Sequence, residues 1–311
     1  MPETMISRWF WLFMFLRMVW VEPEPVSTPA LTKFAAVPDV SSLSEALSSF
    51  SSVVITGGSS GIGKSFIKLC GKLHPELIVC NLSRRAPDIN LVQLKLRHFG
   101  CDLSQSVEIS KVVSELETFL TREAPSGRIL LINNSGFGTF GPFPQPALSE
   151  TLTMIDVNVR AVAHLTGLLL PLLKARGGVI VNVASTAAFL PVAYSAVYAA
   201  SKAFVLHWSL ALNEELRGSG VRALAFCPGT TKTAFFERAG VRAAAMEGRV
   251  TQTSEEVAIA MVRAIGSGRA QAISGFTSRL LMGFSARLPK PLAARLAGKV
   301  TGRFWRRQVN G

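Results

Sequence analysis

Residues 52–73 place a short apolar run directly before a glycine-rich turn, and this pattern constrains the fold more than any other. Residues 52–56 read SVVIT, which is typical of a buried strand. Residues 57–63 read GGSSGIG, and a helix-like sequence follows from Gly63. Such a turn lets the backbone approach a pyrophosphate, and the helix N terminus offers it N–H groups and positive dipole charge. The turn is weak support alone, but with a strand before it and a helix after it, it predicts a dinucleotide-binding unit.

Strand-like and helix-like segments alternate after this turn. Apolar runs at residues 77–82, 128–132, 179–183 and 221–227 are separated by helical patterns, of which residues 106–122 are one example. Right-handed crossovers of this kind bring the strands into one parallel sheet. The sequence therefore predicts an α/β fold with a doubly wound parallel sheet, the Rossmann fold, in a single domain.

The end of the second predicted strand indicates which dinucleotide is bound. In dinucleotide-binding folds an acid at this point accepts the ribose 2′-hydroxyl, whereas a nearby arginine accommodates a 2′-phosphate. Residues 81–83 contain no acid, Arg84 and Arg85 follow them, and Lys64 comes just after the glycine turn. We therefore expect NADP(H), with NAD(H) less favoured. The alternative is a pair of surface arginines at a strand exit.

A serine, a tyrosine and a lysine further along form a candidate catalytic group. Tyr198 and Lys202 lie four apart in an alanine-rich stretch that favours helix, so their side chains share one face. A neighbouring ammonium is expected to lower the phenol's pKa from about 10, which would let Tyr198 exchange a proton with a substrate. Ser185, after the run at 179–183, could hold the substrate oxygen. Alone, this pair occurs often by chance, and Ser185 could be an ordinary turn residue.

These motifs, in this order, resemble the short-chain dehydrogenase/reductase family over residues 52–274. Residues 56–63, TGGSSGIG, match the family's TGxxxGxG turn, and residues 133–136, NNSG, match its NNAG motif with serine in place of alanine. Asp102 matches the acid that contacts adenine. Pro228-Gly229, with two threonines after it, matches the motif that closes over the nicotinamide.

The resemblance implies an oxidoreductase that interconverts a carbonyl and a secondary alcohol with a nicotinamide cofactor. Tyr198 is implied to donate the proton, Lys202 to hold the cofactor ribose, and Asn158 to hold a water in the proton relay. The implied catalytic residues are Asn158, Ser185, Tyr198 and Lys202. The implied cofactor-binding residues are Thr56, Gly57, Ser59, Ser60, Gly61, Ile62, Gly63, Ser83, Arg84, Arg85, Asp102, Leu103, Asn134, Ser135, Gly136, Tyr198, Lys202, Pro228, Gly229, Thr231 and Thr233. No metal site is expected.

Residues 232–253 occupy the place of the family's substrate lid. Phe235, Phe236 and Met246 would give an apolar substrate contact there, or would pack as ordinary lid core. An apolar lid favours reduction of a lipid-like ketone, such as a 3-oxoacyl chain, a steroid or a sphingoid base, without a choice among them. Thr253 and Glu256 predict a capping box that opens the next helix.

Two other functions are weighed against this one. A catalytically silent NADP(H)-binding sensor or scaffold is disfavoured because all four implied catalytic residues are present. A sugar-nucleotide epimerase or dehydratase is disfavoured because the glycine turn lacks the TGxxGxxG spacing of that branch.

The chain divides into three parts by composition. Residues 1–50 are expected to form an apolar extension and linker, with a short helix near its end. Residues 51–275 form the Rossmann domain, and residues 276–311 a basic amphipathic extension. The apolar run at 9–16 has about half of the ~20 residues that a membrane-spanning helix needs. It is read as an interfacial anchor, a weak signal sequence or an extension that does not fold with the domain, with an interfacial or disordered extension favoured.

The formal net charge of +13 is concentrated at the C terminus. From Arg279 onward no Asp or Glu occurs, whereas eight cations do: Arg279, Arg287, Lys290, Arg295, Lys299, Arg303, Arg306 and Arg307. This segment is either solvated, packed over the sheet, or bound to an anionic partner such as a phospholipid surface. No nucleic-acid-binding motif accompanies it, so no nucleic acid is expected.

The remaining expectations concern assembly and location. Residues 150–176 read as one long helix with a kink expected at Pro171. The family resemblance implies that this helix and the helix after Tyr198 pair the subunits of a homodimer or homotetramer, and apolar positions expected to be exposed, Leu168 and Leu172, permit this. The partner is a small carbonyl or alcohol substrate, with peripheral membrane contact through the termini. Four cysteines without a CxxC pair predict reduced thiols in a cytoplasmic protein, membrane-associated if the termini bind: Cys70, Cys80, Cys101 and Cys227.

Overall fold

The computed structural model describes residues 40–90, 92–145, 147–242, 251–285 and 287–310. Residues from Val40 onward form one packed unit. The apolar run at 9–16 therefore lies outside the described residues.

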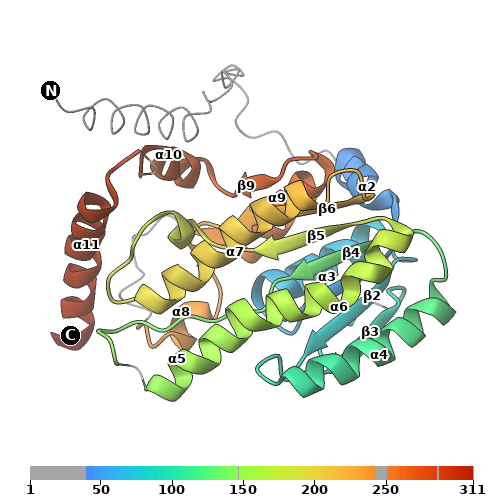
Figure 1. Ribbon diagram of the computed structural model, residues 1–311, viewed down its shortest axis with the longest axis horizontal. Coiled ribbons are helices and arrows are strands. Elements are labelled where there is room, and N and C mark those ends of the chain that lie inside the picture. The colour runs from blue at the N-terminus through green and yellow to red at the C-terminus, as the bar shows by residue number, and fades with distance from the viewer. Residues whose placement is uncertain (1–39, 91, 146, 243–250, 286, 311) are drawn as a thin grey trace, which may run out of the picture. The chain divides into compact units, whose positions relative to one another are not determined.

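Seven parallel strands form the central sheet in the order β3-β2-β1-β4-β5-β6-β9 (Figure 1). The strands are β1 (Phe50–Thr56), β2 (Ile78–Ser83), β3 (Leu96–Gly100), β4 (Arg128–Asn133), β5 (Gly178–Val183), β6 (Val221–Cys227) and β9 (Gln271–Ile273). The predicted doubly wound parallel sheet is confirmed. Its strand order reverses between β1 and β4, which is where such sheets bind ligands, at the carboxyl ends of the strands.

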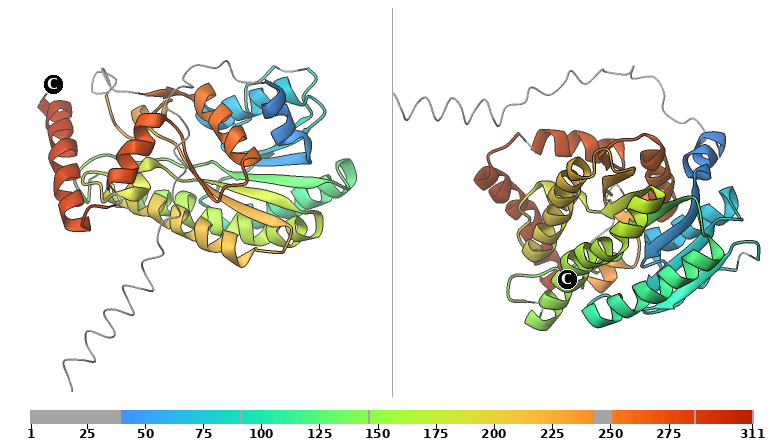
Figure 2. Two further views of the ribbon diagram at one scale, coloured as in Figure 1. Left: turned by 90° about the horizontal axis from the view of Figure 1, so that it is seen from above. Right: turned by 45° about the vertical axis from the view of Figure 1, so that its right-hand side comes forward.

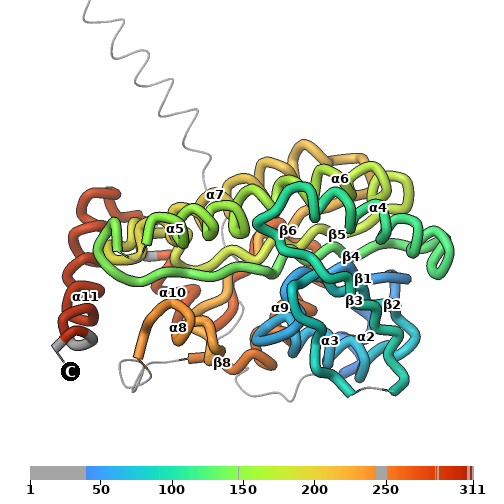
Figure 3. The backbone as a smooth tube through the Cα atoms, turned by 90° about the horizontal axis from the view of Figure 1, so that it is seen from below, coloured from blue at the N-terminus to red at the C-terminus, as the bar shows by residue number. Residues whose placement is uncertain are grey.

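Helices cover both faces of this sheet, as the tube in Figure 3 shows. One face carries α2 (Val40–Ser48), α3 (Gly61–Leu73) and α9 (Ser254–Gly266); the other carries α4 (Ser106–Glu123), α6 (Ala161–Arg176) and α7 (Ala196–Glu215). Alternate residues of β1 face opposite helical layers. Val53 and Ile55 pack under α3, whereas Val54 faces the α4 side. The predicted capping box at the start of α9 is present: Glu256 N donates to Thr253 Oγ1 at 3.1 Å and Thr253 N donates to Glu256 Oε2 at 2.8 Å.

The short predicted helix before β1 belongs to the packed unit. Leu43 and Leu47 of α2 are 3% and 0% exposed and join the core shared with α9. Two leucines four residues apart lie on one helical face, and burying that face fixes α2 against the domain. The sequence places this helix with the linker, whereas the packed unit already begins at Val40.

The long helix predicted at 150–176 contains a π-helical turn that the sequence analysis does not predict. It consists of α5 (Leu148–Ile155), a π-helical turn (Asp156–Arg160) and α6, which continues through Pro171. The π turn carries Asn158, and such turns are frequent at functional sites. Leu168 and Leu172 are half-buried and pack on the core, so the expectation that they are exposed is wrong.

The remaining elements lie near the carboxyl edge of the sheet. They are a 3-10 turn (Thr186–Phe189), the paired short strands β7 (Thr231–Lys232) and β8 (Gln252–Thr253), and helices α8 (Phe235–Arg238), α10 (Phe276–Ser285) and α11 (Lys290–Asn310). Figure 2 shows α11 standing at the periphery of the packed unit. Among the described residues one helical stretch, 148–176, meets the length and composition of a membrane span, which is weak support because core helices meet the same criteria.

Candidate active site

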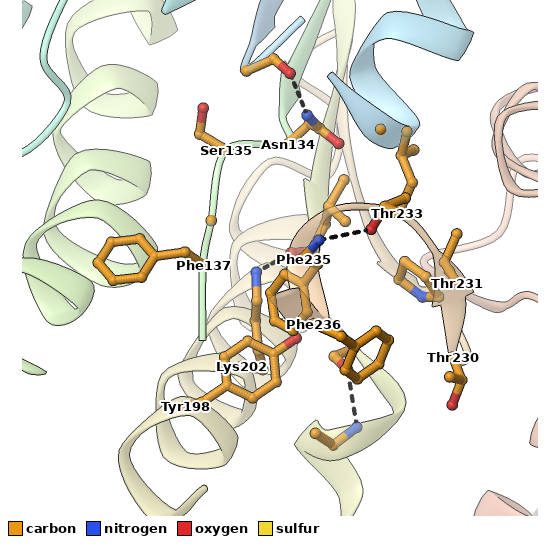
Figure 4. A pocket seen from close by; sticks show the side chains of 18 of the residues that line it. Asn134, Ser135, Phe137, Tyr198, Lys202, Thr230, Thr231, Thr233, Phe235 and Phe236 are labelled. Carbon is orange, nitrogen blue, oxygen red and sulfur yellow. Dashed lines mark hydrogen bonds between the residues drawn. The ribbon is translucent and has the colours of Figure 1, made fainter. Parts of the chain in front are cut away.

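Two adjoining cavities lie at the carboxyl end of the sheet. The first, called here the tyrosine cavity, has a volume of about 310 Å³ and is lined by Tyr198 and Lys202 (Figure 4). The second, called the arginine cavity, has a volume of about 550 Å³ and is lined by Arg84, Arg85 and Asp102. Four residues line both cavities: Ser135, Gly136, Phe137 and Arg238.

Most of the predicted site residues line one of these cavities. The predicted site residues that line the tyrosine cavity are Gly57, Ser60, Gly61, Ile62, Asn134, Ser135, Gly136, Ser185, Tyr198, Lys202, Pro228, Gly229, Thr231 and Thr233. Those that line the arginine cavity are Ser59, Ser83, Arg84, Arg85, Asp102, Leu103, Ser135 and Gly136. Thr56, Gly63 and Asn158 line neither cavity and lie buried behind the wall.

The glycine turn is packed so closely that larger residues would not fit. Gly57 has φ +71°, and a Cβ there would lie 2.7 Å from Ser135 Oγ. A Cβ on Gly63 would lie 2.7 Å from Asn134 Nδ2. Thr56 ties the turn to the loop after β4, because its Oγ1 accepts from the backbone N–H groups of Asn134 at 3.0 Å and Ser135 at 2.9 Å.

This turn fits the diphosphate of a dinucleotide. α3 begins at Gly61, and its N-cap residue Ser60 makes no side-chain capping bond. Ser60, Gly61 and Ile62 all line the tyrosine cavity. The first turn of α3 therefore meets the cavity with N–H groups and the positive end of the helix dipole, which suits an anion.

Asn81 of β2 holds the glycine turn in place through hydrogen bonds. The sequence analysis notes only that residues 81–83 contain no acid. Its Oδ1 accepts from Gly58 N at 2.7 Å, and its Nδ2 donates to Ser83 Oγ at 2.8 Å. The side chain is fully buried in β2. Asn81 therefore positions the turn rather than contacting a ligand. A polar residue within a buried strand was the only sequence signal for this role.

The arginine cavity is lined by three cations, Arg84, Arg85 and Arg238, and by two acids, Asp102 and Glu150. Arg84 and Arg85 follow the end of β2 and are exposed. Burial raises the pKa of Asp102, but hydrogen bonds from Ser104 and the charge of Arg84 outweigh it, so the net pKa lies below its usual value. Lys64 lines neither cavity and pairs with Asp88 at 3.7 Å. Arg84 and Arg85, which the sequence analysis expects to meet a 2′-phosphate, thus both line this cavity.

Tyr198 and Lys202 both reach the tyrosine cavity from α7, as their spacing predicts. The prediction that the pKa of the Tyr198 phenol is lowered is wrong for this structure. Burial raises the pKa of Tyr198 to about 12, and a hydrogen bond with Ser185 only partly opposes it. Burial removes water from around the phenolate and so disfavours the charged form.

The pKa of Lys202 is also shifted by its surroundings. It is 4% exposed, and its Nζ donates to the carbonyl oxygen of Val183 at 2.8 Å. Burial lowers the pKa of Lys202 to about 8, so its charge is held weakly at neutral pH. The ammonium also sits close to Gly136, where a Cβ would lie 3.1 Å from Nζ.

Ser185 follows β5 and caps the 3-10 turn. Its Oγ accepts from Ala187 N at 3.1 Å and is hydrogen-bonded to Tyr198. The two hydroxyls therefore meet at one point on the cavity wall. A carbonyl oxygen at that point would receive hydrogen bonds from both of them.

Asn158 lies behind the cavity wall. Its Nδ2 donates to the carbonyl oxygen of Phe137 at 2.9 Å and to Ser201 Oγ at 3.1 Å, and its Oδ1 accepts from Phe137 N at 3.1 Å. These three bonds join the loop after β4 to α7. In this state the side chain acts as a positioning group, and its implied role as the holder of a water stays a prediction.

The described part of the lid contributes aromatic rings and a cation. Phe235 and Phe236 are half-buried and line the tyrosine cavity, and the Phe235 ring lies 5.3 Å from the Tyr198 ring between centroids (Figure 4). Arg238, which the sequence analysis did not single out, lines both cavities from the same short helix. Met246 lies outside the described residues.

Comparisons with known proteins agree with this geometry. Residues 51–243 match the family model described as short chain dehydrogenase. The ketoacyl reductase HetN of Nostoc sp. is 32% identical over 229 residues, which cover 71% of this chain and 77% of that protein. A serine 3-dehydrogenase of Agrobacterium fabrum is 32% identical over 192 residues, covering 59% of this chain and 73% of that protein.

Solved structures show the same fold. A short-chain dehydrogenase from Sphingobium yanoikuyae in complex with NADPH covers 77% of this chain and 96% of its own, with a TM-score of 0.61 and 24% identity. A short-chain dehydrogenase from Burkholderia cenocepacia in complex with NADP covers 79% and 97%, with a TM-score of 0.65 and 22% identity.

Proposed function

The chain belongs to the short-chain dehydrogenase/reductase family and is an oxidoreductase of that family, and on this premise we propose that it reduces an apolar ketone with NADPH. Tyr198 is the proposed proton donor. The observation that carries the proposal is the meeting of the Tyr198 and Ser185 hydroxyls in a cavity that continues into a cation-lined one. Family members that bind NADPH or NADP in the same fold support the choice of cofactor.

The residues of the two cavities fit NADP(H). The glycine turn and the first turn of α3 would hold the diphosphate, Arg84 and Arg85 the 2′-phosphate, and Asp102 the adenine. Lys202 would hold the nicotinamide ribose, and Pro228-Gly229 with the threonines after it would close over the ring. When bound, the cofactor supplies a hydride to the carbonyl carbon.

The protein's own groups supply the proton and the orientation. Ser185 and Tyr198 hold the carbonyl oxygen, and Tyr198 gives up its phenolic proton as negative charge develops there. A pKa of about 12 keeps Tyr198 protonated at neutral pH, which is the form needed for reduction. The same high pKa makes Tyr198 a poor base for the reverse oxidation.

The substrate class follows from the lid. Phe235 and Phe236 present aromatic rings to the tyrosine cavity, where they would bury an apolar chain beside the carbonyl. The ketoacyl reductase among the relatives is consistent with a lipid-like ketone. We propose residues 232–253 as a substrate lid, and residues 276–311 as a basic extension that brings the enzyme into peripheral contact with a membrane.

The test compares the chain's two tyrosines, Tyr198 and Tyr194. Tyr198→Phe keeps the ring and removes the proton, so ketone reduction with NADPH should fall by about 10²–10⁴-fold. NADPH binding, followed by cofactor fluorescence, should persist in this variant. Tyr194→Phe, which alters a hydroxyl outside both cavities, should keep its activity.

Unchanged turnover in Tyr198→Phe would remove the proton-donor assignment. If the wild type binds NADPH but reduces no ketone in a broad carbonyl screen, the chain is instead a cofactor-binding sensor or scaffold.

A further inference from the structure

α11 is anchored to the domain through an aromatic inner face. Trp305 stacks on Tyr194 with ring centroids 6.0 Å apart and also lies 5.8 Å from Phe140. Gly302 admits the tyrosine ring, since a Cβ there would lie 3.3 Å from it. Phe140 and Tyr194 belong to the loops after β4 and β5, which also border the tyrosine cavity. α11 is therefore a docked element beside the site.

Its outer face carries a stripe of apolar side chains. Leu292, Leu296 and Val300 are 44%, 46% and 61% exposed. They are spaced four residues apart and so lie along one side of the helix. Large apolar groups that remain this accessible on a docked helix indicate a surface made for a further contact.

Cations run alongside this stripe. Arg295, Lys299, Arg303 and Arg306 are exposed on the same outward side of α11. Residues 276–311 contain no Asp or Glu, so none of these charges is neutralised within the segment. Apolar and basic residues side by side on one helix face are typical of helices that lie in the membrane interface.

A surface groove joins the two kinds of group. It has a volume of about 580 Å³ and is lined by Arg295, Lys299 and Arg306, by Tyr194, and by Leu292 and Leu296. Cationic and hydroxyl donors beside apolar surface match a lipid phosphate with the start of its acyl chains.

We propose that the outer face of α11 docks on an anionic phospholipid surface. The leucines and the valine enter the interface, and the cations meet lipid phosphates. A second copy of the chain would set like charges against each other, and a nucleic acid would leave the apolar stripe unburied, so a lipid surface is the occupant that satisfies both features. The inference rests on the peripheral membrane contact proposed above, and not on the reaction.

The experiment measures binding of the full chain to vesicles by co-sedimentation. One set of vesicles is phosphatidylcholine alone and the other contains about one quarter phosphatidylglycerol. The wild type should bind the anionic vesicles more tightly and lose binding as salt is raised. The triple variant R295Q/K299Q/R306Q should weaken this binding by about 100-fold, since each cation near the surface contributes roughly fivefold.

Matched variants separate the surface from general charge and hydrophobicity. K72Q/K111Q/R122Q removes the same number of exposed cations from α3 and α4 and should bind nearly as the wild type does. Val300→Asp should weaken binding by at least about tenfold, whereas Val107→Asp, at an 83% exposed residue of α4, should not.

Two outcomes would overturn the proposal. In the first, the α11 variants bind vesicles as the wild type does, which would assign membrane contact to another segment. In the second, the full chain binds neither vesicle, or binds both equally. Reduction of a water-soluble ketone should be unchanged in every variant, and this readout confirms folding and separates failure of the membrane proposal from failure of the enzymatic one.

Discussion

At the scale of single residues, burial decides the protonation of the site more than pairing does. The Tyr198 hydroxyl and the Lys202 ammonium both lose water, and each is pushed toward its neutral form. The phenol is held as an acid, and the amine titrates near pH 8. The proposed proton donor Tyr198 is therefore protonated at neutral pH, and the charge of Lys202 changes within an accessible pH range.

The lowered pKa of Lys202 predicts a pH-dependent stability. Between about pH 8 and the reference pKa of 10.5, the unfolded chain binds a proton at this lysine that the folded chain has released. Stability therefore rises with pH through that window, by at most roughly 3 kcal/mol. Below pH 8 both states are protonated and the full penalty of burying the charge remains.

Comparison with Lys202→Met isolates this effect. The difference in unfolding free energy between wild type and variant, measured by urea titration from pH 7 to 10, should move in favour of the wild type above pH 8. The cysteines and Tyr198 titrate in both proteins, so they largely cancel in the difference. A difference that stays constant with pH would show that Lys202 keeps its ordinary pKa.

Arg84 and Arg85 predict the cofactor preference. Replacing both with serine removes the cations placed to meet a 2′-phosphate, and hydrogen bonds to charged groups contribute about 1.5–3 kcal/mol. The Kd for NADPH should rise by roughly 10- to 100-fold, whereas the Kd for NADH should change little. Lys64→Gln, which removes a cation that lines neither cavity, serves as the control. Equal losses for both cofactors would contradict the assignment.

At the scale of elements, the short helix α8 lies in the proposed lid and borders the cavity that contains Tyr198. No residue of α8 is fully buried, and Phe235 lies against the Tyr198 ring. The two phenylalanines therefore line the cavity, as the proposed substrate contact requires. Arg238, one turn along, brings a positive charge to the junction of the two cavities.

Phe235→Ala tests the lid as a substrate contact. A buried aromatic ring contributes about 1.5–3 kcal/mol, so the KM for a long-chain ketone should rise by about tenfold or more. The KM for a small polar ketone should change less. Phe143→Ala, at a 68% exposed residue outside both cavities, is the matched control. A lower KM in Phe235→Ala would instead identify the ring as an obstacle to substrate.

At the scale of the whole molecule, the helical layer of α5, α6 and α7 carries exposed apolar side chains, and we propose this face for pairing subunits. Leu148 and Leu152 of α5 are 54% and 53% exposed, and Phe204 of α7 is 40% exposed and stacked on Trp208. Leu168 and Leu172, which the sequence analysis names for this role, are half-buried against the monomer's own core. The proposed homodimer or homotetramer would therefore use the α5 and α7 residues.

Phe204→Glu tests this face. Burying a charge at the centre of an apolar interface without a partner is costly, so the variant should become monomeric at micromolar concentration. Light scattering coupled to size-exclusion chromatography gives the mass directly. Val107→Glu, on the opposite flank in α4, should leave the mass of the wild type unchanged. A wild type that is itself monomeric would remove the assembly proposal.

The sequence by itself determined the sheet, the cofactor turn and the Tyr–Lys pair, because these depend on short-range patterns. Alternating apolar runs, glycines at fixed positions and a spacing of four on a helix act within a few residues of chain. The capping box at Thr253 and Glu256 belongs to the same class, and it is present.

Only the tertiary structure decided the properties that depend on neighbours from distant segments. The direction of the Tyr198 pKa, the bonds that occupy Asn158, the role of Asn81 under the glycine turn and the place of Arg238 all arise where separate loops meet. The π-helical turn at Asp156–Arg160 is of the same kind. Burial and hydrogen bonding are sums over contacts in space, and a linear pattern does not contain those contacts.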